Sequence, residues 1–144
     1  MKHFLVIGNP INHSYSPQLH NYRLKKNNIN AVYKKEKLNF SDLKDLSSRI
    51  KDSELNGVNV TVPFKKDIIP YLDELSLEAK NTQSVNTIHL IDNKLIGHNT
   101  DVEGFKKAIE ETKFDINGKT IFILGAGGVV PSIIYALNKM KVSE

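Results

Sequence analysis

Gly57-Val58-Asn59-Val60-Thr61-Val62-Pro63-Phe64-Lys65-Lys66 is the stretch that decides the fold. Four of its first six residues are β-branched, which favours a strand. The three valines stand at every second position and so lie on one face of the strand, whereas Asn59 and Thr61 lie on the other. Pro63 cannot donate a ladder hydrogen bond, so we expect the strand to end there, with Lys65 just beyond it. In open α/β sheets ligands bind beyond the carboxyl ends of strands, so this stretch predicts a polar site. An ordinary strand followed by two solvated lysines is the alternative.

Strand and helix patterns alternate on both sides of this stretch, which is typical of an α/β fold. The apolar run 4–7 predicts a strand covered on both faces, and the lysine-rich run 31–35 predicts an edge strand. Asp92-Asn93 is typical of a turn and predicts a hairpin between strands 85–91 and 94–97. These strands should flank the central one.

Apolar residues at helical spacing predict the helices of the chain. We expect longer helices at residues 16–27, 41–50, 101–113 and 130–141. Their first turns carry residues that are typical of helix caps, namely Ser16 before Pro17, Ser41, and Thr100 paired with Glu103. Shorter helical segments are expected around Leu72, Leu75 and Ala79.

Composition narrows the class of protein. A chain of 144 residues, 40% hydrophobic and 25% charged, fits one globular domain or one domain and part of another. The net charge of +4 comes from scattered lysines, which favours anionic small molecules as partners over a nucleic-acid surface. The absence of cysteine excludes disulfides and Cys-ligated zinc, and the histidines show no metal-binding spacing. No apolar run approaches the roughly 20 residues of a membrane span, and the short apolar start fits no signal peptide, so a cytoplasmic protein is expected.

A second informative stretch is Gly125-Ala126-Gly127-Gly128. It follows the apolar run 119–124, which predicts a strand, and precedes the expected helix 130–141. Strand, glycine loop and helix in this order are typical of a dinucleotide phosphate site, because glycines admit the pyrophosphate to the backbone at a helix N-terminus. Val130 stands where such sites usually have glycine or alanine. A plain tight turn is the alternative.

Other polar residues gain meaning only in combination. Ser14 and Ser16 place two hydroxyls in the loop after the first strand, where both could donate to one carboxylate. The simpler interpretation is that Ser16 caps the following helix and that Ser14 is an ordinary loop residue without a function. Asp101 in a first helical turn is explained by the helix dipole alone, and Asn86 by pairing with backbone.

Five motifs stand in order along the chain: Gly8-Asn9-Pro10-Ile11-Asn12-His13-Ser14-Tyr15-Ser16-Pro17, Asn59-Val60-Thr61-Val62-Pro63-Phe64-Lys65, Val85-Asn86-Thr87, Gly97-His98-Asn99-Thr100-Asp101 and Gly125-Ala126-Gly127-Gly128. Together they closely resemble the shikimate dehydrogenase family. The resemblance implies reversible reduction of 3-dehydroshikimate to shikimate with NADPH, in aromatic amino-acid biosynthesis. It allows a homodimeric parent and implies no nucleic-acid or membrane partner.

The resemblance also implies an architecture. Residues 1–101 would form a three-layer α/β substrate domain with a mixed sheet. Residues 102–144 would form a linker helix and the first β-loop-α unit of a Rossmann domain that binds NADP(H). The active site would lie in the cleft between the two domains.

Roles for individual residues follow from the resemblance. Lys65 and Asp101 match the catalytic pair. The matched substrate-binding residues are Ser14, Ser16, Asn59, Thr61, Lys65, Asn86 and Asp101. The matched cofactor-binding residues are Gly125, Ala126, Gly127, Gly128 and Val129. No metal is implied.

The resemblance covers only about half of a complete family member, so a fragment of a longer enzyme is expected. A dinucleotide site needs two mononucleotide-binding halves, and this chain supplies one. Two alternatives therefore stay open. The chain could be a shikimate-binding fragment that does not catalyse the reaction, or its parent could be a quinate/shikimate dehydrogenase that uses NAD.

Overall fold

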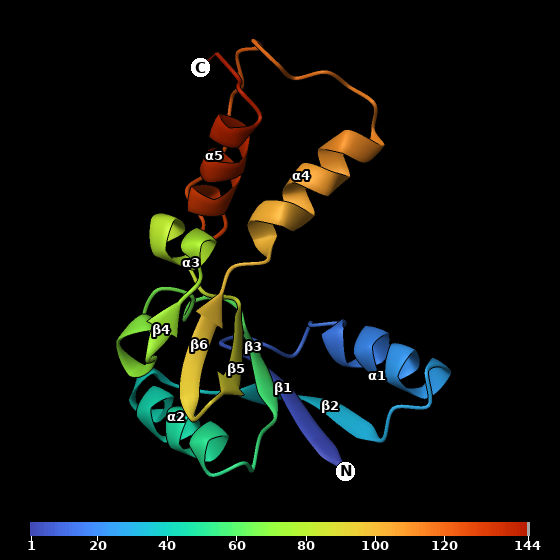
Figure 1. The fold of residues 1–144 in the computed structure, drawn as a ribbon, viewed down its shortest axis with the longest axis vertical. Helices are drawn as coiled ribbons and strands as arrows, with labels where there is room; N and C mark the ends of the chain where they lie inside the picture. Colours follow the sequence, from blue (N-terminus) through green and yellow to red (C-terminus); the bar gives the residue numbers. More distant parts are fainter. Residues whose placement is uncertain (144) are drawn as a thin grey trace.

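The computed structural model describes residues 1–143, which form one mixed sheet with helices on both faces and a helix pair beyond it (Figure 1). The strands are β1 (Lys2–Gly8), β2 (Ala31–Lys37), β3 (Gly57–Val60), β4 (Glu74–Leu75), β5 (Thr87–Ile91) and β6 (Lys94–His98). Their order in the sheet is β2-β1-β3-β5-β6-β4. In the described part of the chain, β5 alone runs antiparallel to its neighbours, so the other strands share one direction.

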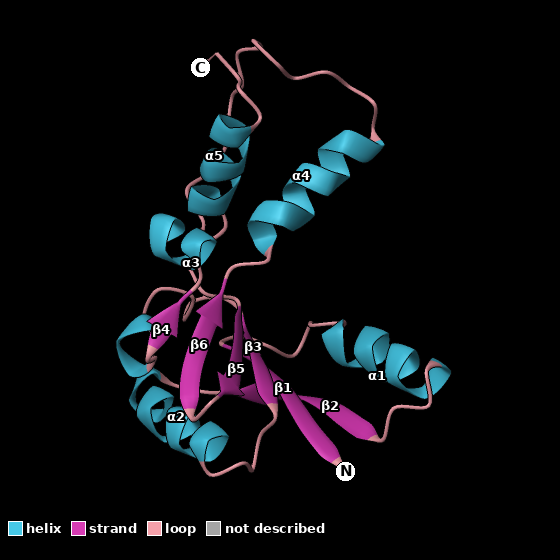
Figure 2. Ribbon diagram, in the orientation of Figure 1, coloured by secondary structure: helices cyan, strands magenta, loops and turns pink. Residues whose placement is uncertain are grey.

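The helices form layers around this sheet. They are α1 (Ser16–Lys26), α2 (Leu43–Lys51), α3 (Leu77–Thr82), α4 (Asp101–Glu111) and α5 (Val130–Lys139), with single turns η1 (Phe40–Asp42) and η2 (Ile69–Tyr71). α1 packs on β2 at one face and α2 packs on β5 and β6 at the other, while α4 and α5 contact each other beyond the sheet (Figure 2). The α/β class and the mixed sheet predicted from sequence are confirmed. None of the helices within residues 1–143 has the length and hydropathy of a membrane span.

β1 shows how the sequence builds two apolar layers. Leu5 and Ile7 face the cluster that α2 covers, whereas Phe4 and Val6 face the cluster on the side of α1. Every residue of this strand's apolar run therefore packs in one of the two clusters, as expected of a strand covered on both faces. The larger cluster also contains Leu43, Leu46, Ile50, Val58, Val60, Phe64 and Ile68.

The central strand is shorter than the valine alternation predicts. β3 ends at Val60, although the Thr61 amide still donates to the Ile7 carbonyl at 3.0 Å. The chain then turns, with the Phe64 amide donating to the Thr61 carbonyl at 3.0 Å. Val62 therefore lies outside the strand and is 49% exposed, so the predicted continuation of the strand to Pro63 is wrong. The early turn buries Phe64 and delivers Lys65 to the end of the strand.

Several local predictions are also corrected. Ser16 is the first residue of α1 and makes no capping hydrogen bond with its side chain. At the start of the next helical segment the capping box joins Asn39 and Asp42, while the Ser41 hydroxyl donates to Asp42. Leu75 lies in β4 and not on a helix, because its backbone pairs beside β6. Competing side-chain partners, which spacing alone does not reveal, decide these caps.

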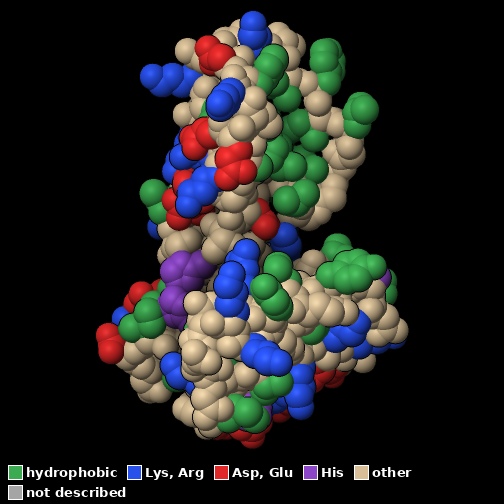
Figure 3. All heavy atoms as spheres, turned by 90° about the vertical axis from the view of Figure 1, so that its right-hand side faces the viewer, with side chains coloured by type: hydrophobic (Ala, Val, Ile, Leu, Met, Phe, Trp, Pro, Cys, Tyr) green, Lys and Arg blue, Asp and Glu red, His purple; other side chains and the backbone are tan. Residues whose placement is uncertain are grey.

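The predicted strand at 119–124 is absent from the structure. Phe122 and Leu124 are 88% and 98% exposed, and no sheet in the described residues pairs with this segment. Figure 3 shows hydrophobic side chains gathered over the upper part of the molecule, which α4, α5 and their connection form. An apolar run becomes a strand only where a neighbouring strand takes its backbone hydrogen bonds, so pattern alone predicted too much. The helix expected after the glycine loop is confirmed as α5.

The packing of α2 gives the first prediction. Leu46 is fully buried in the larger cluster, so Leu46→Ala should lower the free energy of unfolding by about 2–5 kcal/mol in urea denaturation. Leu77→Ala is the matched control, because Leu77 is 63% exposed at the start of α3. Equal losses in the two variants would contradict this placement of the core.

Candidate active site

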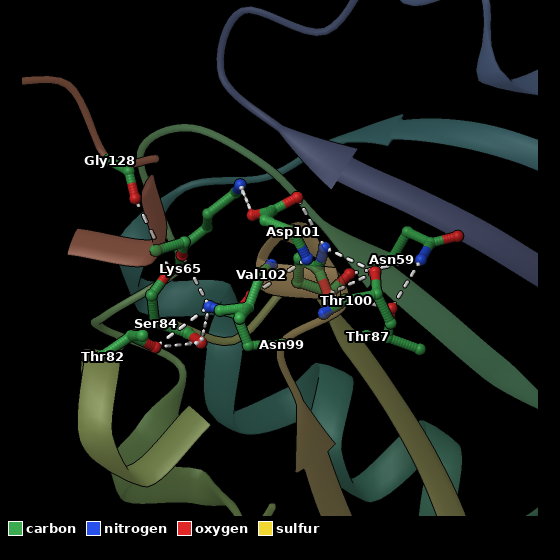
Figure 4. Close-up of polar contacts among 12 residues, drawn as sticks. Asn59, Lys65, Thr82, Ser84, Thr87, Asn99, Thr100, Asp101, Val102 and Gly128 are labelled. Carbon is green, nitrogen blue, oxygen red and sulfur yellow. Dashed lines mark hydrogen bonds and ion pairs between the residues drawn. The ribbon is translucent and has the colours of Figure 1, made fainter. Parts of the chain in front are cut away.

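Strand ends bring the predicted catalytic residues together at one edge of the sheet. Lys65 follows β3 and Asp101 follows β6, and these two strands share a direction. The Lys65 Nζ lies 2.6 Å from Asp101 Oδ2, with the side chains only 16% and 24% exposed (Figure 4). A charge pair sheltered in this way is screened less by water and salt than a pair on the surface. The pair can hold an ammonium proton close to a bound substrate.

Asn86 connects this pair to the sheet. It directly precedes β5, and because β5 runs opposite to its neighbours, this position lies at the same edge as Lys65 and Asp101. Its Nδ2 donates to Asp101 Oδ1 at 2.9 Å, so both carboxylate oxygens of Asp101 are held by predicted site residues. Its Oδ1 accepts the backbone N–H of Thr100 at 3.0 Å.

The predicted capping box of α4 is wrong, since the Thr100 side chain makes no capping hydrogen bond. The Thr100 hydroxyl contacts Asn86 at 2.8 Å, and Glu103 pairs with Lys106 at 3.0 Å. Asn99 Oδ1 takes over the capping role, accepting the amides of Asp101 at 3.0 Å and Val102 at 3.3 Å. The residue that fixes the helix start therefore also fixes the position of Asp101.

Asn99 is a buried hub that the sequence analysis left without a role. Besides capping α4, its Nδ2 group shares its two hydrogens among three acceptors, which are Thr82 Oγ1 at 3.0 Å, the Ser84 carbonyl at 2.9 Å and Ser132 Oγ at 2.7 Å. Ser132 is fully buried in the first turns of α5, so one amide joins α3, α4 and the helix after the glycine loop. Its place in the motif 97–101, between a strand and a predicted cap, was the sequence signal that could have identified it.

The Asn59 side chain is at the same edge, but its amide is engaged by the protein. Its Nδ2 donates to the Asn86 carbonyl at 3.2 Å and to Thr87 Oγ1 at 3.0 Å (Figure 4). Its Oδ1 accepts the Tyr33 hydroxyl at 2.6 Å. Tyr33 and Thr87 were not expected at the site. Their role depends on cross-strand neighbours, which strand register determines and local spacing does not.

The serine pair lies in the loop after β1, which neighbours β3 in parallel, so this loop leaves the same edge of the sheet. Ser14 Oγ accepts the amide of Ser16 at 3.3 Å, and both residues are half-buried. Within residues 1–143 the hydroxyls of Ser16 and Thr61 have no hydrogen-bond partner, and no hydrogen bond joins the serine pair to Lys65 or Asp101. The capping explanation for Ser16 therefore fails, which leaves its hydroxyl available to a ligand.

The glycine loop faces this edge. A cavity of about 210 Å³ is shared by the loop and Lys65, and its lining residues are Thr61, Val62, Pro63, Lys65, Gly128 and Val129. A second cavity of about 440 Å³ lies between the loop, Lys65 and the end of α3. A Cβ built on Gly127 or Gly128 would meet nothing, which shows open space for a ligand against the backbone. Gly125 has a φ of +121°, a conformation that favours glycine.

Two histidines meet on the sheet outside this site. The Nε2 atoms of His89 on β5 and His98 on β6 are 3.3 Å apart, and burial, followed by the nearby His89, lowers the pKa of His98. The residues 1–143 contain no group of three or more His, Cys, Asp or Glu side chains placed to hold a metal ion.

Comparison with known proteins places these features in context. Residues 6–88 match the family model described as the shikimate dehydrogenase substrate binding domain. A curated relative, the NADP(+) shikimate dehydrogenase of Pelagibacter ubique, is 57% identical over 143 residues, covering 99% of this chain and 54% of the relative. The chain thus spans about half the length of the curated relatives it matches.

Solved structures agree. Shikimate dehydrogenase 1 from Peptoclostridium difficile superimposes with a TM-score of 0.93 at 37% identity, covering 100% of this chain and 55% of the other. The shikimate 5-dehydrogenase of Thermus thermophilus in complex with NADP(H) and shikimate gives a TM-score of 0.90 at 30% identity, covering 99% and 54%. The fold of this chain is therefore the fold of the corresponding half of those enzymes.

The Asn99 hub gives the second prediction. Asn99→Ala removes the hydrogen bonds by which one side chain joins α3, α4 and α5, so we expect the free energy of unfolding to fall by about 1–3 kcal/mol. Asn138→Ala, on the exposed side of α5, serves as the control and should change it by less than about 0.5 kcal/mol. Urea denaturation of both variants measures the difference. An Asn99→Ala variant as stable as the control would show that the hub contributes nothing to packing α5.

Proposed function

The chain belongs to the shikimate dehydrogenase family, and from this membership we propose that it supplies the substrate site of an enzyme that interconverts 3-dehydroshikimate and shikimate with NADP(H). The observation that carries the proposal is the sheltered Lys65–Asp101 pair, which Asn86 holds at the sheet edge facing the glycine loop. We propose residues 1–101 as the substrate domain and residues 102–144 as a linker helix and the start of the cofactor domain.

Substrate recognition would use the polar groups at this edge. The Ser14 and Ser16 hydroxyls would donate to the substrate carboxylate, since Ser16 is not used as a helix cap. Thr61, Asn86 and Asp101 would hydrogen-bond the ring hydroxyls, with Asn59 beside them. These side chains would bind the carboxylate at one end of the substrate and the hydroxyls at the other end, which would set the orientation of the ring.

Lys65 would handle the proton of the reaction. As the C3 carbonyl becomes a hydroxyl, the Lys65 ammonium donates a proton to the developing alkoxide, and it takes the proton back in the reverse direction. Asp101 keeps the ammonium directed at that oxygen through the 2.6 Å contact. Because Lys65 is mostly buried, water screens its attraction to Asp101 less than it would at the surface.

The cofactor would lie along residues 125–129. The open space at Gly127 and Gly128 and the start of α5 fit a pyrophosphate, which favours backbone amides at a helix N-terminus. When bound, NADPH supplies the hydride to C3. The loop shares a cavity with Lys65, so hydride and proton would be delivered to neighbouring atoms of the substrate.

A second candidate is a chain that binds shikimate without turning it over. It is favoured by the absence of a strand at 119–124, which leaves the glycine loop without the sheet that normally supports it. The two candidates share the substrate site and differ in turnover.

The third prediction tests the substrate site. Isothermal titration should show shikimate binding to this chain, and Ser14→Ala/Ser16→Ala should weaken it by about tenfold or more, since two charge-assisted hydrogen bonds are lost. Ser48→Ala, on the exposed side of α2, is the control and should bind as the parent does. If the unsubstituted 144-residue chain is folded and does not bind shikimate, the proposed substrate is refuted.

The fourth prediction concerns Lys65. Lys65→Ala should reduce NADP-dependent oxidation of shikimate by about 10²–10⁴-fold while the dissociation constant changes little. The assay follows the absorbance of the reduced nicotinamide. Binding with no turnover in the unsubstituted chain would favour the second candidate, and near-normal turnover in Lys65→Ala would remove Lys65 from the mechanism.

A further inference from the structure

We propose that Tyr33 and Thr87 are positioning residues, which orient the Asn86 amide and through it the Asp101 carboxylate that directs Lys65. The inference rests on the proposed function for the roles of Asp101 and Lys65. The orientation of the amides themselves stands on hydrogen bonding alone. At each contact, the orientation of the amide is set by which of the two groups is able to donate a hydrogen.

The Asn86 amide has one orientation that satisfies its neighbours. The backbone N–H of Thr100, 3.0 Å away, can only donate, so it identifies the atom facing it as Oδ1. The Nδ2 group must then face Asp101 Oδ1, which can only accept when ionised, at 2.9 Å. A flipped amide would place two oxygens against each other at Asp101. The orientation of Asn86 therefore decides whether Asp101 gains or loses a hydrogen bond.

The Asn59 amide is fixed by the same logic. The backbone carbonyl of Asn86 can only accept, so the group facing it at 3.2 Å is Nδ2 of Asn59. Its Oδ1 then faces the Tyr33 hydroxyl at 2.6 Å, and Tyr33 must donate. Both amide hydrogens of Asn59 are used, one on the Asn86 carbonyl and one on Thr87 Oγ1. In this arrangement Asn59 supports Asn86.

The Thr87 hydroxyl connects the Asn59 amide to the Asn86 amide. It accepts from Asn59 Nδ2 at 3.0 Å, which leaves its single hydrogen for Asn86 Oδ1 at 3.1 Å. The donors therefore run one way, from Tyr33 through Asn59 and Thr87 to Asn86, and then to Asp101. Every hydroxyl and amide in this series has one assignment, so removal of one donor takes away one of the hydrogen bonds that hold the next amide in place.

The start of the series is secured by packing. Tyr33 is 5% exposed on β2 and its ring stacks on His20 at 4.3 Å between centroids. Burial raises the pKa of the Tyr33 hydroxyl well above its ordinary value, so the hydroxyl keeps its proton at neutral pH and can donate. An edge strand thereby contributes a permanent donor to a site that lies on the other side of β1 and β3.

Thr87 gives a matched pair of variants. Thr87→Val keeps the β-branched shape and removes the hydroxyl, while Thr87→Ser keeps the hydroxyl. We expect Thr87→Val to weaken shikimate binding about tenfold, as the loss of one supporting hydrogen bond at the site does, and Thr87→Ser to bind within about threefold of the parent chain. Isothermal titration gives the affinities, and thermal unfolding shows that the chains are folded.

A spectroscopic measurement separates positioning from general destabilisation. In ¹H–¹⁵N spectra without ligand, the side-chain NH₂ signals of Asn86 should move in Thr87→Val and stay in place in Thr87→Ser. Tyr33→Phe should move them in the same direction, whereas Tyr22→Phe, at an exposed tyrosine of α1, should not.

The results decide the two proposals separately. Unmoved Asn86 signals in Thr87→Val and Tyr33→Phe, or unchanged affinity in Thr87→Val, would overturn the positioning role. If the parent chain binds no shikimate, the proposed function fails. The Asn86 signals then still decide whether Thr87 and Tyr33 orient this amide.

Discussion

The contact between Lys65 and Asp101 is the interaction on which the arrangement of this molecule depends. The two residues are far apart in the sequence, and their 2.6 Å contact requires β3 and β6 to end at the same edge of the sheet. That requirement is met because β5 between them runs in the opposite direction, which also puts its first residues at this edge. A mixed sheet thus brings two carboxyl ends and one amino end together, and the ammonium, carboxylate and amide meet there.

A second constraint links this edge to the glycine loop. Asn99 caps α4, which starts with Asp101, and the same side chain donates to Ser132 in α5. The helix that carries the acid and the helix that follows the glycine loop are therefore positioned by one buried amide. Within residues 1–143 no buried side-chain nitrogen or oxygen lacks a hydrogen-bond partner, so no buried side-chain atom of this polar hub is left unpaired. A satisfied buried network of this kind favours one relative placement of the two helices.

Much of the fold could be predicted from the sequence, because the hydrophobic patterns of β1 and α2 and the turn of the hairpin are local signals. The predictions that failed depended on partners elsewhere in the molecule. Val62 leaves the core because the chain turns after Thr61, and the run 119–124 forms no strand because no neighbour pairs with it. For the site, the residue types were visible in the motifs. Thr87 stands in a motif but received no role, and Tyr33 stands in none, because their contribution arises only once β2, β3 and β5 are in register.

The central claim is that the edge formed by β1, β3, β5 and β6 is a shikimate site, and mapping of the bound ligand tests it most directly. Backbone ¹H–¹⁵N signals of the labelled chain would be followed during titration with shikimate. We expect small changes on α2 and β4 and the largest changes at the proposed site residues, namely Ser14, Ser16, Thr61, Lys65, Asn86 and Asp101. Changes concentrated away from this edge, or none in a folded chain, would contradict it.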